Sequence, residues 1–173
     1  MKIEVDTVKG FQDYLPPESL KRDAVRKVIE RNFKLHGFVP IETPVVEFDE
    51  MMKSENLNEE EAVSDRFKLQ DRAGRNLGLR YEFTFQLARI FKQNTNIKLP
   101  FRRYQIGEVF RDEPTGAGRF RQFTQCDADI IGDSSLEADT ECLSLIKDIL
   151  NDLKIKFEIN INNRKLLKAI IES

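Results

Sequence analysis

Charged and amide side chains alternate with small or apolar ones along residues 122–130. In a β-strand, side chains two residues apart share a face. The odd positions then carry an aromatic ring, an amide and two carboxylates, namely Phe123, Gln125, Asp127 and Asp129. Neighbouring carboxylates on one face repel each other and are an odd choice for a core. This face therefore either meets solvent or binds a cationic or hydrogen-bonding ligand.

The odd and even positions of a second segment, 101–111, also fall on opposite faces of a predicted strand. One face takes Tyr104, Ile106, Phe110 and Glu108, and the other takes Arg103, Gln105, Gly107, Val109 and Arg111. Residues 79–85 alternate as well and predict a third strand with Glu82 on its polar side. The three strands would share a charged face that is costly to bury without a ligand or mutual pairing. Its members are Glu82, Arg111, Gln125 and Asp129.

The residue types available restrict the chemistry. The chain has one histidine, His36, and two cysteines, Cys126 and Cys142, which disfavours His-rich metal sites, a Ser-His-Asp relay and a CxxC pair. Residues 98–121 hold six basic and three acidic side chains, and arginines can fork onto phosphate oxygens. The chain has no GxxxxGK[ST] or GxGxxG motif, so any phosphate chemistry must use arginines and carboxylates.

Composition excludes two classes of protein. The 173 residues have a net charge of −2, which excludes a globally basic nucleic-acid-binding protein. No apolar run approaches the roughly 18–20 residues of a membrane span, and the first residues do not read as a signal peptide. We expect a soluble, cytoplasmic protein with no membrane partner.

Hydrophobic periodicity predicts the elements that position the charged face. We expect an amphipathic helix after Pro16 and Pro17, closed by Gly37, and an edge strand or extended arm over 38–46. The acidic stretch 47–65 predicts a solvated connection without a chemical role. The later segments predict hairpins at 66–79 and 101–131, helices at 86–93, 136–153 and 164–172, and a half-buried strand at 155–161. The fold class is α+β, a mostly antiparallel sheet flanked by helices.

Several of these segments resemble histidyl-tRNA synthetases, a family of class II aminoacyl-tRNA synthetases. GFQDYLPPE at 10–18 is similar to the family's opening segment, and LRYEFT at 79–84 is similar to its LR-x-(E/D)-x-T segment. FRDE at 110–113, GRFRQF at 118–123 and Gln125 resemble class II motif 2 in its histidyl form, about 101–131. The helix and strand at about 19–46 resemble motif 1, which builds the family's dimer interface. Tyr81 stands where many relatives carry proline.

The resemblance implies histidine activation with ATP and Mg²⁺, followed by transfer of the histidyl group to tRNA(His), in a homodimer built through motif 1. Arg111 would be the catalytic contact to the α-phosphate. Glu113 and Arg119 would help to hold ATP, and Phe123 would stack on adenine. For histidine, Glu82 and Gln125 would bind the α-amino group with Thr84 nearby, and Asp129 would reach the imidazole. The resemblance assigns no residue of this chain to a metal.

Family members continue into a motif 3 and an anticodon-binding domain, and neither is found in this sequence. We therefore expect residues 1–173 to be a partial, truncated class II catalytic domain. An alternative is a non-catalytic paralogue that serves as the regulatory subunit of an ATP phosphoribosyltransferase in histidine biosynthesis. A regulator has no need of Arg111, Glu113 and Arg119, and all three are present. A third reading is an α+β domain whose charged face is merely solvated.

Overall fold

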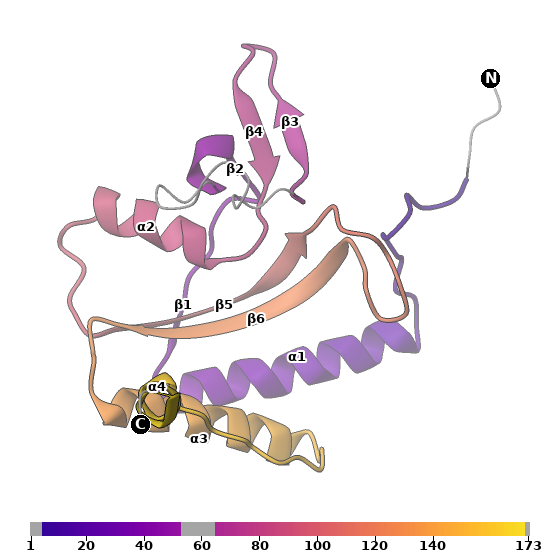
Figure 1. Ribbon diagram of the computed structural model, residues 1–173. Coiled ribbons are helices and arrows are strands. Elements are labelled where there is room, and N and C mark those ends of the chain that lie inside the picture. Colours follow the sequence, from indigo (N-terminus) through magenta and orange to yellow (C-terminus); the bar gives the residue numbers. More distant parts are fainter. Residues whose placement is uncertain (1–4, 53–64, 172–173) are drawn as a thin grey trace.

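The computed structural model describes residues 5–52 and 65–171 (Figure 1). The amino-terminal half contains α1 (Glu18–Leu35), β1 (Val39–Pro40), β2 (Val46–Phe48), the short 3₁₀ helix η1 (Asp49–Met52), β3 (Lys68–Gln70) and β4 (Asn76–Leu79). The rest contains α2 (Thr84–Gln93), β5 (Phe101–Phe110), β6 (Gln122–Ile131), α3 (Leu136–Asp152) and α4 (Arg164–Ile171). Within this described part, no helix is long and apolar enough to cross a membrane.

Two small sheets form the fold. The main sheet has the order β1-β5-β6, in which β5 and β6 are antiparallel and β1 runs parallel to β5 at the edge. The second sheet has the order β2-β4-β3 and is antiparallel. Figure 1 shows α1 and α3 side by side beneath the long β5–β6 pair, with the second sheet and α2 above it. The predicted α+β class, with a mostly antiparallel sheet flanked by helices, is confirmed.

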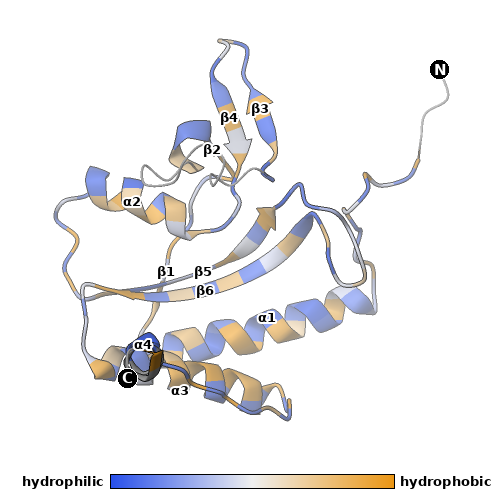
Figure 2. Ribbon diagram, viewed as in Figure 1, coloured by the Kyte–Doolittle hydropathy of each residue, from blue (hydrophilic) through white to orange (hydrophobic). Residues whose placement is uncertain are grey.

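The hydrophobic core lies between the main sheet and the two long helices. Phe33, Phe38, Tyr104 and Leu145 form its buried centre. Ile106 of β5 and Ala128 of β6 pack against it from the strand face that the period-two pattern predicts. The helices present the matching apolar stripes, so apolar and polar residues alternate along both of them in Figure 2. Burial of this one face leaves the other face of β5 and β6 for polar side chains.

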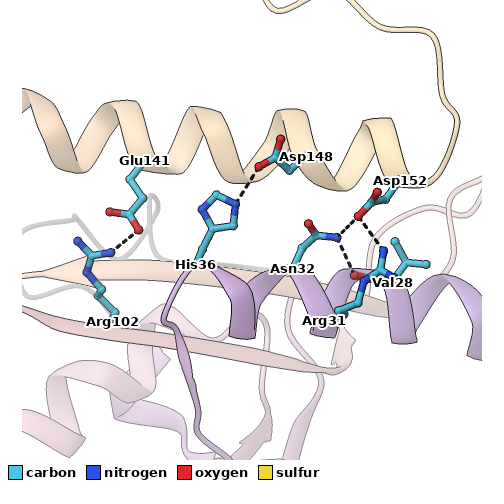
Figure 3. Close-up of polar contacts among 8 residues, drawn as sticks. All are labelled: Val28, Arg31, Asn32, His36, Arg102, Glu141, Asp148 and Asp152. Carbon is cyan, nitrogen blue, oxygen red and sulfur yellow. Dashed lines mark hydrogen bonds and ion pairs between the residues drawn. The ribbon is translucent and has the colours of Figure 1, made fainter.

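Polar contacts align α1 with α3 along the edge of this core (Figure 3). Asn32 donates to Asp152 at 2.8 Å, and Arg31 donates to the same carboxylate at 2.8 Å. The Nε2 atom of His36, at the end of α1, lies 3.0 Å from Asp148. The single histidine of the chain therefore joins two helices, which accords with its place near a helix terminus.

Residues 155–161 do not form the predicted strand. The segment is irregular, and its four apolar residues are exposed: Ile155, Phe157, Ile159 and Ile161. A strand needs a neighbour for its backbone hydrogen bonds, and the described residues offer none to this segment. Alternation in the sequence indicates which face a strand would bury, but the pairing partner decides whether it forms.

The acidic stretch after Val46 is also less solvated than its composition predicts. Glu47 accepts a hydrogen bond from Arg89 at 2.6 Å, and both Asp49 oxygens accept from Arg66 at 2.5 and 2.8 Å. Both carboxylates are buried. The expectation of a solvated connection is wrong for these two residues, because each pairs with an arginine distant in sequence. The prediction for 53–64 lies outside the described residues.

The Asp49–Arg66 pair gives the first prediction. Asp49→Asn keeps the shape of the side chain but removes the carboxylate charge that is paired with the buried guanidinium. Loss of one partner of a buried ion pair is expected to lower the free energy of unfolding by about 3 kcal/mol. Urea unfolding measures the change. Asp23→Asn, which breaks the exposed 2.7 Å pair with Lys27, is the matched control and is expected to change stability little. Equal losses in the two variants would contradict the prediction.

Candidate functional site

The face of β5 and β6 that points away from the helices carries the polar side chains. Arg103 pairs across the strands with Asp129, and Gln105 pairs with Asp127. Further along, Gly107 lies opposite Gln125 and Val109 lies opposite Phe123. The predicted sorting of these two strands into an apolar and a charged face is therefore confirmed. Asp129 and Phe123 lie six residues apart, about 20 Å along the strand, and Gln125 lies between them.

One end of this face, here called the carboxylate end, consists of Glu82, Arg103, Asp127 and Asp129. Arg103 is fully buried and forms an ion pair with Asp129. Burial raises the pKa of Asp129; Arg103 opposes that rise, and the charge of Glu82 adds to it. The pKa of Asp127 is also raised, chiefly by burial. Gln125 donates to both Asp127 oxygens, at 2.9 and 2.8 Å.

Glu82 reaches the carboxylate end from an unexpected element. The predicted strand over 79–85 is wrong, since β4 ends at Leu79 and α2 begins at Thr84. Glu82 Oε1 accepts a hydrogen bond from the backbone N–H of Phe85 at 2.6 Å, which satisfies one of the free donors in the first turn of α2. Phe83 and Leu87 are buried at helical spacing. The charged face thus receives Glu82 from a helix start.

The other end, here called the arginine end, consists of Tyr81, Arg111, Glu113 and Phe123. The guanidinium of Arg111 lies 4.4 Å from the centre of the Tyr81 ring and 5.0 Å from that of Phe123. Its Nε donates to the Tyr81 carbonyl at 3.4 Å. The Tyr81 hydroxyl donates to Glu113 at 2.8 Å. Tyr81 therefore holds both the cation and the carboxylate of this end in place.

The loop between β5 and β6 is tied to the opening segment at its base and is exposed to solvent at its tip. The backbone N–H of Arg111 donates to the carbonyl of Arg121 at 2.8 Å. The carbonyl of Gly10 accepts from the N–H of Arg121 at 2.8 Å, so the opening segment packs against the loop base. Gly10 has φ +87°, and a Cβ there would lie within 2.9 Å of the Arg121 side chain. Arg119 lies at the exposed tip, paired through its backbone with Gly116.

The eight residues named from the sequence therefore fall into three groups. The carboxylate end contains Glu82 and Asp129, and Gln125 joins it through a hydrogen bond to Asp127. The arginine end contains Arg111, Glu113 and Phe123. Thr84 is exposed at the start of α2, and Arg119 is exposed at the loop tip. Sequence reasoning missed Arg103 and Tyr81 as site residues. Face sorting contained the signal for Arg103, which shares a face with Asp129, whereas the contacts of Tyr81 depend on tertiary structure.

The donor groups of the described residues bear on metal binding. Among residues 5–52 and 65–171, no group of three or more His, Cys, Asp or Glu side chains is arranged to hold a metal ion. Within the carboxylate end, Asp129 is already paired with the Arg103 guanidinium. The described side chains therefore do not form a metal centre of their own.

The fold and the arginine-bearing hairpin are those of a class II aminoacyl-tRNA synthetase. A family model described as "Histidyl-tRNA synthetase" matches residues 10–173. The "Histidine--tRNA ligase 1" of Bacillus cereus is 42% identical over 99% of this chain and 39% of that protein. The chain therefore belongs to the histidyl-tRNA synthetase family, and it spans about 39% of the length of this relative.

Solved structures agree with this assignment. The crystal structure of histidyl-tRNA synthetase from Nostoc sp. superposes with a TM-score of 0.85 at 32% identity, over 98% of this chain and 40% of that one. A Bacillus halodurans structure, described as an ATP phosphoribosyltransferase regulatory subunit/histidyl-tRNA synthetase, superposes with a TM-score of 0.75 at 25% identity, over 87% of this chain and 38% of that one. Both likenesses cover most of the present fold.

The raised pKa of Asp127 gives the second prediction. A carboxyl whose folded pKa lies above its unfolded value stabilises the fold at low pH and loses that contribution as the pH rises through the folded pKa. Asp127→Asn is therefore expected to gain stability relative to wild type as the pH rises from about 3 to 7, around the unfolded value of about 3.9. Unfolding in urea across this range measures the difference.

Asp133→Asn is the control with the opposite sign. Hydrogen bonds from the hydroxyl and backbone N–H of Ser135 lower the pKa of Asp133, which is partly exposed. Its contribution to stability is present above the unfolded pKa and is lost as the pH falls through the folded pKa. This variant should lose stability relative to wild type as the pH rises. A pH-independent difference for Asp127→Asn would contradict the account of the carboxylate end.

Proposed function

We propose that the chain forms part of an enzyme that activates histidine with ATP and transfers the histidyl group to tRNA(His). The observation that carries the proposal is the single sheet face with carboxylates at one end and a guanidinium between two aromatic rings at the other. Such a face matches the two substrates, since an amino acid presents an ammonium and ATP presents phosphates and a flat base. The family of the chain supports the same assignment.

ATP is assigned to the arginine end. Arg111 would contact the α-phosphate, and the Phe123 ring would stack on adenine, with Glu113 and Arg119 holding the rest of the nucleotide. The contacts of Tyr81 with Arg111 and Glu113 support this assignment, because they fix both side chains before the ligand arrives. Mg²⁺ would accompany ATP and neutralise phosphate charge, and we assign it no protein ligand.

Histidine is assigned to the carboxylate end. Glu82 and Gln125 would bind the α-ammonium group, with Thr84 nearby at the start of α2, and Asp129 would accept a hydrogen bond from the imidazole ring. An analogue without the ring N–H would leave Oδ1 of Asp129 without its hydrogen-bond donor, which costs about 1–3 kcal/mol. The cluster suits a cationic group because it contains three carboxylates and one guanidinium.

The proposed reaction needs little proton transfer in its first step. A histidine carboxylate oxygen attacks the α-phosphorus in line, a P–O bond to the amino acid forms, and the P–O bond to pyrophosphate breaks. Arg111 would stabilise the charge on the α-phosphate oxygens in the transition state. A terminal ribose hydroxyl of tRNA(His) then attacks the acyl carbonyl and releases AMP. We also propose that copies of the chain pair through the motif 1 segment, 19–46.

A regulatory role is the second candidate. The likeness to the Bacillus halodurans structure, whose description includes a regulatory subunit, favours it. Against it stand Arg111, Glu113 and Arg119, since a subunit that does not handle ATP phosphates has no use for this set. Copurification with an ATP phosphoribosyltransferase, in the absence of ATP binding, would favour the regulator over the ligase.

Histidine-dependent exchange between ATP and pyrophosphate tests the proposed function. Arg111→Ala should lower the exchange rate about 100-fold, because a preorganised donor to the transition-state charge is lost. Arg75→Ala removes an exposed arginine in the turn between β3 and β4 and serves as the control, with an unchanged rate expected. No exchange together with no ATP binding in the wild-type chain would overturn the proposal.

Tyr81→Phe tests the arginine end more finely. The variant keeps the ring that contacts Arg111 and loses only the hydroxyl that donates to Glu113. Loss of one such hydrogen bond should weaken ATP binding by about threefold to tenfold. Histidine affinity should stay the same, and calorimetric titration with each ligand separates the two effects. Equal losses for ATP and histidine would show that the substitution acts on the fold and not on this end alone.

A further inference from the structure

Arg103 lies beneath the charged face at its carboxylate end and has no role in the resemblance described above. Its side chain is completely buried, with 0% exposure. The strand register places it directly opposite Asp129, and its Nη2 forms an ion pair with Asp129 Oδ2. None of its three nitrogen atoms, Nε, Nη1 and Nη2, makes a hydrogen bond within the described part of the chain, so its contact with Asp129 is an ion pair alone. Burial of a guanidinium with so few partners destabilises the fold, so its neighbours should indicate a function that the charge performs.

Arg80 provides the contrast within the same fold. It is also buried, but its Nε donates to the carbonyl of Glu108 at 2.7 Å and its Nη1 to the carbonyl of Thr43 at 3.0 Å. Arg80 therefore braces the backbone, which is the common use of a buried arginine. Arg103 instead forms its ion pair with Asp129 and feels the charges of two further carboxylates, Asp127 and Glu82. The difference indicates that the Arg103 guanidinium balances the charge of the carboxylates and does not brace the backbone.

The ion pair with Arg103 leaves the two carboxylate oxygens of Asp129 in different environments. Its Oδ2 atom faces Arg103 and is buried, whereas the side chain as a whole is 34% exposed. The exposed part therefore belongs to the remaining atoms, Oδ1 among them. One oxygen is fixed from below by the guanidinium, and the other remains available to a ligand on the charged face.

The groups around Asp129 would otherwise push it toward its neutral form. Asp127 lies on the same strand, and Glu82 approaches from the segment before α2. The Cys142 thiol of α3 lies on the helix side of the sheet and interacts with Asp129 only through its electrostatic field. Burial and the charge of Glu82 raise the pKa of Asp129, and Arg103 opposes both. Burial also raises the pKa of the Cys142 thiol, which stays neutral near pH 7. A protonated Asp129 would be a donor at one oxygen and a poor acceptor for a ring N–H.

We propose that Arg103 is the positioning residue of the carboxylate end, holding Asp129 ionised and fixed through Oδ2 so that Oδ1 accepts a hydrogen bond from the neutral imidazole ring of histidine. The inference rests on the proposed function for its ligand. With the guanidinium charge balancing the carboxylate, the pair needs no imidazolium to neutralise it. Histidine should therefore bind near neutral pH with its ring uncharged and with no proton uptake.

The experiment combines a titration of the free protein with ligand binding. NMR of a sample labelled at the aspartate carboxyl carbons gives the pKa of Asp129, and calorimetry in two buffers of different ionisation enthalpy gives histidine affinity and proton uptake. Arg103→Met removes the charge at similar length, and Arg103→Lys keeps the charge but loses the planar fork. Arg102→Met is the matched control, since Arg102 lies on the other face of β5 and pairs with Glu141 of α3 (Figure 3).

Arg103→Met should raise the pKa of Asp129, weaken histidine binding about 10-fold to 100-fold and couple the remaining binding to proton uptake. ATP affinity should not change, which separates this role from a general loss of fold. Arg103→Lys should leave the pKa of Asp129 near its wild-type value and weaken histidine binding less than Arg103→Met does. This variant keeps the test decisive if Arg103→Met fails to fold. Arg102→Met should behave as wild type for both ligands.

Two results would overturn the inference, and they differ from failure of the proposed function. An unchanged Asp129 pKa in Arg103→Met, or histidine binding by Arg103→Lys as tight as by Arg102→Met, overturns the role of Arg103 whatever the chain binds. Failure of the wild-type chain to bind histidine overturns the proposed function and the ligand assigned here with it.

Discussion

The antiparallel pairing of β5 with β6 is the constraint on which the rest of the structure depends. Ten residue pairs, from Phe101–Ile131 to Phe110–Gln122, fix both strands in one register. A shift by a single residue would exchange the two faces and place the carboxylates against the helices. The apolar residues that pack on α1 and α3 therefore set the position of every polar residue on the opposite side.

This dependence explains which parts of the sequence analysis succeeded. Period-two sorting depends only on local geometry, and it placed Phe123, Gln125 and Asp129 on one face correctly. It failed at 79–85, where seven residues alternate but the chain forms a strand end and a helix start, because so short a run fits either element. It failed again at 155–161, where the pattern is sound but no neighbouring strand exists among the described residues. Pairing partners far away in sequence decided both cases.

Buried charge was the other feature that sequence reasoning could not place. Glu47 and Asp49 read as part of a solvated acidic run, and each is buried against an arginine from another element. Arg103 had been sorted onto the right face, but nothing in its neighbours along the chain indicated complete burial. Arginines of this kind require knowledge of what covers them, which comes only from the assembled fold. The same holds for Tyr81, whose two partners, Arg111 and Glu113, both lie in the loop after β5.

The packing of Gly10 against Arg121 links the amino terminus to the loop that carries the proposed ATP contacts. The carbonyl of Gly10 accepts a hydrogen bond from the loop base, and the Arg121 side chain lies so close to the glycine that a Cβ there would collide with it. A side chain at position 10 would therefore displace Arg121, and a change in the opening segment would be transmitted to the base of the loop.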